Sequence, residues 1–240
     1  MKTRLAICFA LLLAGLALCA ANAPRLHLLG ADPVRLFPAR SAHPAIAAVF
    51  LSGDMGFNFG IGADVAEGVA ARGIPVVGVS SPVVFARHHT RAEVDAVVAG
   101  AVRLALARTG AQRVVLMGQS YGADIIATTA PDLPPDLRPR IAAIALTVPA
   151  QDVYFRADPS GLAYLGQPDA LPLPRLRKLE GIPLVCVYGL QESGSLCPAL
   201  TGTSARVIGL PGNHYLDHDP GRVVAAMLGA LRAAVPGAGI

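Results

Sequence analysis

Short apolar runs alternate along this chain with longer segments in which apolar residues recur at helical spacing. The run AIAAVFL over 45–51 precedes a helical pattern over 63–72, and IPVVGVS over 74–80 precedes another over 91–108. Continuous apolar runs of this length are typical of strands that helices cover on both faces. The alternation predicts an α/β fold with a doubly wound, mostly parallel sheet.

The second half of the chain keeps the same order. Further strands are predicted over 113–118, 141–148, 182–189 and 205–212, and further helices over 123–129 and 219–234. Thr90 and Glu93 have the spacing of a capping box at the start of the long helix, and Gly110 follows its end. Asp219 is suited to cap the last helix, with Pro220 in its first turn.

Two proline-rich segments fall outside the alternation. The first, over 131–140, is predicted to be a rigid surface loop. The second, over 151–181, is either a cap over the site or an ordinary solvated connection, since long loops in compact domains are functional or mobile. Its basic residues either meet a phosphate headgroup or stay solvated; they are Arg156, Arg175, Arg177 and Lys178.

The N-terminus has the pattern of a secretory signal peptide over 1–23. Lys2 and Arg4 precede an apolar run over 5–18, and small residues follow before Pro24. The run is shorter than the roughly 20 apolar residues that span a bilayer. We therefore expect export to the periplasm with cleavage of the leader, rather than a transmembrane anchor.

The sequence leaves the cleavage site open within a few residues. Ala20 and Ala21 both suit the position before the cut. A lipoprotein signal that would attach a lipid at Cys19 is the less favoured alternative, because Leu18 stands where a small residue is wanted.

Composition indicates one folded domain over 24–240. Hydrophobic residues make up 53% of the chain and charged residues 15%, which is enough apolar material for a substantial core. Loss of Lys2 and Arg4 with the leader lowers the formal charge from +4 to +2. This mild, unclustered charge argues against a nucleic-acid partner.

The cysteines indicate one disulfide in the exported domain. Cys8 and Cys19 lie in the leader, which leaves Cys186 and Cys197 to pair in an oxidising compartment. The alternative is that both stay unpaired, with Cys186 buried in its strand. No Cys-x-x-Cys motif or histidine cluster indicates a metal, and no cofactor is implied.

The strongest candidate for a catalytic motif is Gly118-Gln119-Ser120-Tyr121-Gly122, a G-x-S-x-G motif between a predicted strand and a predicted helix. Glycines at both ends allow a sharp turn that projects the Ser120 hydroxyl out of the sheet. The helix N-terminus and the Tyr121 N–H then face a developing oxyanion. This context predicts a nucleophile at Ser120; the alternative is a glycine turn with a capping serine.

A serine nucleophile requires a base, and His214 is the best-placed histidine. It follows the last predicted strand, in a loop at the C-terminal edge of the sheet, on the side of Ser120. His218 in the same loop is the competing candidate. His88 and His89 precede a helix and are left outside the triad.

The acid that orients the histidine is expected between Ser120 and His214 in the chain. Glu192 follows the strand over 182–189 by a few residues, and the predicted disulfide brackets its loop. Asp152 is the second candidate and Asp217 a distant third.

The loop over 52–56 is expected to supply a second oxyanion donor from the backbone near Gly53, Asp54 and Met55. The Asp54 side chain cannot donate to an oxyanion, so it either accepts N–H groups of its own loop or meets a cationic substrate group. Asp124 lies in the first turn of a helix, where its charge favours the helix dipole.

With these motifs in place, the chain resembles the bacterial virulence protein VirJ family, which includes the AcvB proteins. The resemblance extends from about Val49 to the last helix and implies an exported α/β-hydrolase linked to type IV secretion and virulence. AcvB-type members hydrolyse lysyl-phosphatidylglycerol. The matching pieces are LSGDMGF, VAARGIPVVGVSS, RVVLMGQSYGADI, PLVCVYGLQESGSLCP and LPGNHYLD. The residues that the resemblance supports are Ser120, His214 and Glu192 as a triad, and Asp54 or Asp124 as contacts for a lysyl ammonium group.

Together these features predict an exported serine hydrolase that cleaves a carboxylic ester, with a membrane phospholipid headgroup as a candidate part of its substrate. Two alternatives remain open. One is a catalytically silent periplasmic binding module that assists type IV secretion or virulence through secretion-system proteins. The other is a small-molecule carboxylesterase or thioesterase, which shares the mechanism and differs in the pocket.

Overall fold

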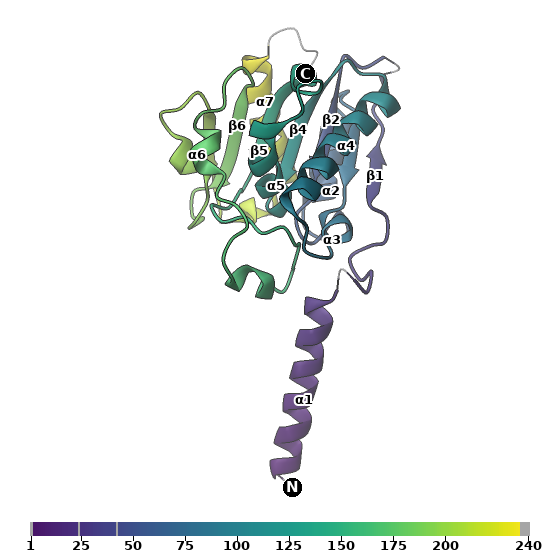
Figure 1. The fold of residues 1–240 in the computed structure, drawn as a ribbon, viewed down its shortest axis with the longest axis vertical. Coiled ribbons are helices and arrows are strands. Elements are labelled where there is room, and N and C mark those ends of the chain that lie inside the picture. The colour runs from purple at the N-terminus through teal and green to yellow at the C-terminus, as the bar shows by residue number, and fades with distance from the viewer. Residues whose placement is uncertain (1, 24, 42, 236–240) are drawn as a thin grey trace.

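Figure 1 shows the computed structural model, which describes residues 2–23, 25–41 and 43–235. Pro24, the first residue of the expected domain, and the C-terminal residues 236–240 lie outside the described residues. The first helix, α1 (Lys2–Ala21), extends away from a body of sheet and helices. Among the residues described, no helix has the length and apolar character needed to cross a membrane.

A seven-stranded sheet forms the centre of the body, in the order β1-β3-β2-β4-β5-β6-β7. All neighbouring strands are parallel except β1, which pairs antiparallel with β3. The predicted mostly parallel sheet is therefore confirmed. Its strands are β1 (Val34–Phe37), β2 (Ile46–Leu51), β3 (Val76–Val79), β4 (Arg113–Gln119), β5 (Ile141–Thr147), β6 (Leu184–Gly189) and β7 (Arg206–Leu210).

The edge strand β1 lies in a stretch for which the sequence predicts no element. It has only four residues, of which Arg35 and Leu36 are exposed in succession and Phe37 is buried. Such a strand shows neither a continuous apolar run nor a full alternation, so the periodic signal is missing.

Helices cover both faces of the sheet (Figure 1). On one face, α4 (Arg91–Thr109) and α5 (Tyr121–Thr129) share a hydrophobic core with the strands. On the other face, α2 (Gly62–Ala70) packs against α7 (Pro220–Ala234) in a second core. Because both faces are covered, central strands such as β2 and β5 are buried at every position.

The helix ends confirm the predicted capping. In α4 the Thr90 hydroxyl accepts the Glu93 N–H, and the Glu93 carboxylate accepts the Thr90 N–H. Gly110 ends the helix with φ of 70°, in the left-handed region that favours glycine. At the start of α7, the Asp219 carboxylate accepts the Arg222 N–H at 2.9 Å.

Both proline-rich segments contain short helical turns. The segment over 131–140 is not the plain loop predicted, because the 3-10 turns η1 (Ala130–Asp132) and η2 (Arg138–Arg140) occupy its ends. Proline presets the φ that a first helical turn needs. The segment over 151–181, called the cap segment below, holds η3 (Leu162–Leu165) and α6 (Leu173–Leu176).

Candidate active site

Ser120 lies at a sharp turn between β4 and α5. Its backbone has φ of 52° and ψ of −125°, a conformation that non-glycine residues rarely adopt. A Cβ at Gly118 would collide with the backbone of Gly122, and a Cβ at Gly122 would collide with that of Leu51. Glycine is therefore required on both sides of the serine, and the turn holds Ser120 at the C-terminal edge of the sheet.

The structure brings Ser120, His214 and Glu192 together. The Ser120 hydroxyl is 2.8 Å from Nε2 of His214, and Nδ1 of the same ring is 2.5 Å from Oε1 of Glu192. The three residues follow the separate strands β4, β7 and β6. Because the carboxylate accepts a hydrogen bond from Nδ1–H, Nε2 carries no proton and accepts a hydrogen bond from the serine hydroxyl. The geometry is that of a nucleophile, a base and an orienting acid.

The Glu192 carboxylate raises the pKa of the His214 imidazole through this hydrogen bond. Burial of the ring acts in the opposite direction, and the nearby carboxylates of Asp124 and Asp54 add to the rise. The Glu192 side chain is only 7% exposed, and its second oxygen has no hydrogen-bond partner within the described chain. His214 is therefore the group that offsets the burial of this carboxylate.

The other acids considered as triad members are not bonded to the histidine. Asp152 is exposed at the cavity wall, and no hydrogen bond joins it to His214 in the part of the chain that the structure describes. Asp217 forms an ion pair with Arg222 at 3.9 Å. Glu192 is thus the acid that the fold places at the histidine.

The other histidines considered for the triad, His218, His88 and His89, have partners other than Ser120 and Glu192. His218 stacks on Tyr215, with ring centroids 5.4 Å apart. His88 pairs with Asp169 at 2.8 Å, and His89 is buried. His218 lines the cavity near Ser120, whereas His88 and His89 do not appear in its lining.

The loop over 52–56 faces the serine. A Cβ placed on Gly53 would lie 3.6 Å from Cβ of Ser120. The loop is held in place by Ser81, at the start of α3 (Ser81–Val84): its N–H donates to the Ser52 hydroxyl at 3.0 Å, and its hydroxyl donates to the Ser52 carbonyl at 2.6 Å. The predicted oxyanion residues line one cavity; they are Gly53, Asp54, Met55 and Tyr121.

A cavity of about 780 Å³ opens beside Ser120. The larger side chains in its lining are mostly carboxylates and aromatic rings. No lysine or arginine is among the described residues that line it. Tyr154 and Tyr164 come from the cap segment, which therefore lines part of the site. The other acidic and aromatic side chains of the lining are Asp54, Asp124, Asp152, Phe59, Tyr121 and Tyr215.

Asp124 is a buried carboxyl in the wall of this cavity. It is 9% exposed, and it accepts the Ala150 N–H at 2.7 Å. Burial raises its pKa to about 8, against the opposing effects of that hydrogen bond and of His214. The side chain turns into the protein instead of into solvent, so burial is the largest influence on its pKa.

Asp54 is the second carboxyl in the wall. Burial raises its pKa, while a hydrogen bond from Tyr164 and the charge of His214 lower it. The Tyr164 hydroxyl donates to Oδ2 of Asp54 at 3.3 Å. Sequence reasoning missed this tyrosine, because an isolated aromatic residue in a proline-rich segment has no periodic signal and its partner lies far away in the chain.

Cys186 and Cys197 form a disulfide, as predicted, and it closes the loop that carries Glu192. Cys186 lies in β6 and Cys197 begins η4 (Cys197–Leu200), and both are fully buried. The two ends of the Glu192 loop are thereby fixed to the edge of the sheet.

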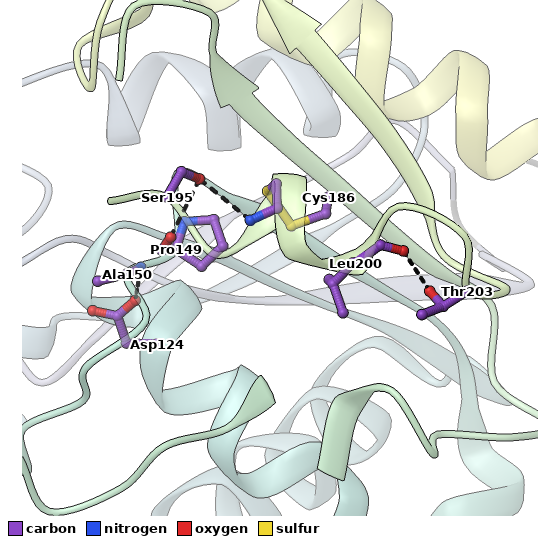
Figure 2. The surroundings of a disulfide bond; sticks show 8 residues. Asp124, Pro149, Ala150, Cys186, Ser195, Leu200 and Thr203 are labelled. Carbon is purple, nitrogen blue, oxygen red and sulfur yellow. Dashed lines mark hydrogen bonds between the residues drawn. A yellow bond between two sulfur atoms is a disulfide. The ribbon is translucent and has the colours of Figure 1, made fainter. Parts of the chain in front are cut away.

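Figure 2 shows that the disulfide loop also contacts the segment beside Asp124. The Ser195 hydroxyl donates to the Pro149 carbonyl and accepts the Cys197 N–H, each at 3.4 Å. Ala150, which follows Pro149, forms an isolated β-bridge with Ser195 and donates its N–H to the Asp124 carboxylate. The covalent loop therefore supports the surroundings of both Glu192 and Asp124.

Replacing both cysteines by serine is expected to lower the free energy of unfolding by about 3 kcal/mol, because a crosslink over this short loop restricts the unfolded chain. Hydrogen exchange over 190–196 should accelerate as the loop loses its anchor. Thermal and denaturant unfolding of the Cys186→Ser/Cys197→Ser protein would measure the loss. Reducing agent should destabilise the wild type and leave the double variant unchanged; equal stability of the two proteins would show that the bridge has no structural role.

The parallel sheet, the strained serine turn and the Ser-His-Glu series at the strand ends together define the α/β-hydrolase class. The family described as "Bacterial virulence protein (VirJ)" matches residues 45–235. The chain belongs to this family. No curated protein sequence matches it.

Solved structures agree with the class. Est1E from Butyrivibrio proteoclasticus superimposes with a TM-score of 0.60 at 13% identity, over 84% of this chain and 93% of that one. The esterase domain of a Rhodothermus marinus protein superimposes with a TM-score of 0.57 at 17% identity, over 83% of this chain and 91% of that one. A thioesterase domain from the curacin biosynthetic pathway superimposes with a TM-score of 0.56 at 14% identity, over 81% of this chain and 94% of that one. At these identities the likeness establishes the fold.

Proposed function

We propose that this protein is a serine hydrolase that cleaves a carboxylic ester, with Ser120 as nucleophile, His214 as general base and Glu192 as the orienting acid. The observation that carries the proposal is the continuous hydrogen-bonded series of these three side chains at the wall of an open cavity. The G-x-S-x-G turn and membership of the VirJ family support it.

In the first half-reaction the Ser120 oxygen attacks the acyl carbon while Nε2 of His214 takes the serine proton. Glu192 stabilises the imidazolium that forms. Backbone N–H groups of Tyr121 and of the loop over 52–56 bind the oxyanion. The C–O bond to the alcohol then breaks, the leaving alcohol takes the proton from His214, and the acyl group stays on Ser120.

In the second half-reaction a water molecule attacks the acyl-enzyme. His214 takes a proton from the water, the bond from the acyl carbon to Ser120 breaks, and the serine recovers its proton from His214. The products are a carboxylic acid and the alcohol released earlier. No step requires a group beyond these residues and water.

We further propose that the acyl group is cationic, as in lysyl-phosphatidylglycerol. Asp54 and Asp124 lie in the cavity wall, and no lysine or arginine is among the described lining residues to neutralise them. A buried carboxylate is stable when an opposite charge faces it, and an ammonium group would lower the pKa of Asp124 from about 8 and favour its ionised form. Both acids therefore gain from a cationic ligand.

A small neutral ester or thioester is the second candidate substrate. The solved neighbours include an esterase domain and a thioesterase domain, and the aromatic lining of the cavity suits an apolar acyl chain as well. The two candidates share every step of the mechanism and differ in what Asp54 and Asp124 contact.

We also propose that the protein acts in the periplasm. The leader-like pattern over 1–23 supports export, and the buried disulfide is compatible with an oxidising compartment. There the site would meet phospholipid headgroups at the membrane surface. The family description supports a further link to virulence. Secretion-system proteins are the partners that we propose for that role.

Turnover of lysyl-phosphatidylglycerol tests the proposed substrate. Asp124→Asn keeps the acceptor for the Ala150 N–H but removes the charge, and we expect it to lower lysine release by about tenfold to a hundredfold, the usual effect of losing a hydrogen bond to a charged group. Hydrolysis of p-nitrophenyl butyrate by the same samples should fall much less.

Asp54→Asn tests the second carboxylate in the same two assays, and Ser120→Ala is the inactive control. Equal effects on the lipid and the butyrate ester would contradict a cationic site. Unchanged lysine release in both aspartate variants would do so as well. Turnover of the butyrate ester alone by the wild type would favour the small neutral substrate.

A further inference from the structure

We infer that Tyr164 is a positioning residue that fixes the Asp54 carboxylate in the cavity and thereby sets the preference of the site for a cationic acyl group. The hydrogen bond between Tyr164 and Asp54 is observed in the structure, whereas the preference for a cationic acyl group rests on the proposed function. The inference gives the cap segment a role in recognition.

The contact joins two distant parts of the chain. Tyr164 lies in η3 of the cap segment, and its hydroxyl donates to Oδ2 of Asp54 at 3.3 Å while it accepts the Asp158 N–H at 2.9 Å. Both Tyr164 and Asp54 line the cavity beside Ser120. Burial and the neighbouring Asp54 charge raise the pKa of the phenol, so it remains protonated and acts as the donor.

The Tyr164 hydroxyl is itself held by a rigid turn of the cap segment. Asp158 is 1% exposed, and its carboxylate accepts the Ser160 N–H at 3.0 Å, the Ser160 hydroxyl at 2.6 Å and the Ala163 N–H at 2.9 Å. The ring of Tyr154 packs against that of Tyr164 with centroids 5.2 Å apart. The donor thus reaches Asp54 from a fixed direction.

Fixing Asp54 matters for charged substrates in particular. Within the described chain Tyr164 is the side chain that hydrogen-bonds Asp54, and the Asp54 backbone N–H is a second donor to the carboxylate. Removal of the phenol leaves the carboxylate held from its own backbone alone and so gives it more freedom to rotate. A cation gains most from a carboxylate already held in place, because less freedom is lost on binding. A neutral acyl group makes no such contact, so its turnover does not depend on the direction of the carboxylate.

The test compares two esters of the same chain length, 1-lysyl-glycerol and 1-hexanoyl-glycerol, of which the second carries no ammonium group. Tyr164→Phe is expected to lower the ratio of their kcat/KM values, lysyl over hexanoyl, by about tenfold, the lower end for a hydrogen bond to a charged group because 3.3 Å is long. Tyr188→Phe is the matched control. Tyr188 lies in β6, outside the cavity lining, and the ratio should stay at the wild-type value.

A double-mutant cycle separates positioning from general damage to the cap. If Tyr164 acts through Asp54, then Tyr164→Phe has no further effect on the ratio in an Asp54→Asn background. An equal loss for both esters, or a full additional effect in that background, would overturn the inference. So would an unchanged ratio in Tyr164→Phe.

Carbon-13 NMR of labelled aspartate gives a readout that needs no turnover. Loss of the phenol donor should raise the pKa of Asp54 in Tyr164→Phe, and Asp54→Asn assigns the signal. A wild type that hydrolyses neither ester would refute the proposed function, and the NMR result would then decide whether Tyr164 positions Asp54. An Asp54 pKa that does not change would overturn the inference in every case.

Discussion

Replacing Ser120 with alanine is expected to abolish covalent labelling by a fluorophosphonate and to lower ester hydrolysis on the order of 10⁴- to 10⁶-fold. The alanine has no oxygen to attack the acyl carbon, and what catalysis remains comes from binding and from the oxyanion donors. In-gel labelling of the purified mature protein, followed by turnover of lysyl-phosphatidylglycerol on the same samples, measures both effects.

A matched control separates this effect from a change in fold. Ser204→Ala removes an exposed serine hydroxyl before β7, away from the cavity lining, and should leave labelling intact. Alanine at position 120 must adopt the same strained backbone conformation, with φ of 52°, as the serine does. The two variants should therefore unfold at similar temperatures. A wild type that does not react with the probe would favour the catalytically silent binding module, and full activity in Ser120→Ala would exclude Ser120 as the nucleophile.

Glu192→Gln is expected to lower kcat by about 10²- to 10⁴-fold, because an amide no longer stabilises the imidazolium and can hold the ring in the wrong tautomer. The same substitution should change the pH profile. Glu192 raises the pKa of His214 through its hydrogen bond, so its loss lowers that pKa. The base is active when unprotonated, and the acidic limb of kcat/KM should therefore move to lower pH.

Asp152→Asn is the comparison that assigns the acid. Asp152 is the alternative left open by the sequence, and it lies at the cavity wall without a hydrogen bond to His214 among the described residues. The acidic limb should not shift in this variant. A larger loss of kcat in Asp152→Asn than in Glu192→Gln would show that the ring reorients toward Asp152 during the reaction.

Much of the fold was predictable because covered parallel strands leave long apolar runs in the sequence. The runs that became β2, β4, β5 and β6 were all located, and so was the capping box at Thr90. The edge strand β1 escaped because four residues, two of them exposed in succession, carry too little pattern. Register and neighbour order, such as β2 between β3 and β4, required the structure.

The site was predictable where chemistry demands a local motif and unpredictable where it depends on contacts across the chain. Ser120 is marked by its flanking glycines, and His214 by its place after the last strand. The sequence offered several acids for one role, and only geometry singles out Glu192. The contact from Tyr164 depends on how the cap segment folds beside the cavity, and the hydrogen bond from Ala150 to Asp124 depends on the course of the chain after β5.

The burial of Asp124 also makes folding depend on pH. Its pKa is raised from 3.8 to about 8 in the folded protein, so the folded state holds a proton that the unfolded chain releases. The stabilisation from this group is complete below about pH 4 and is lost progressively as the pH rises through about 8. In alkaline solution the folded chain must carry a charge inside its wall. An apolar residue in place of Asp124 would increase the stability of the folded protein but would remove the charge from the cavity. Selection for thermal stability and selection for a charged cavity therefore act on Asp124 in opposite directions.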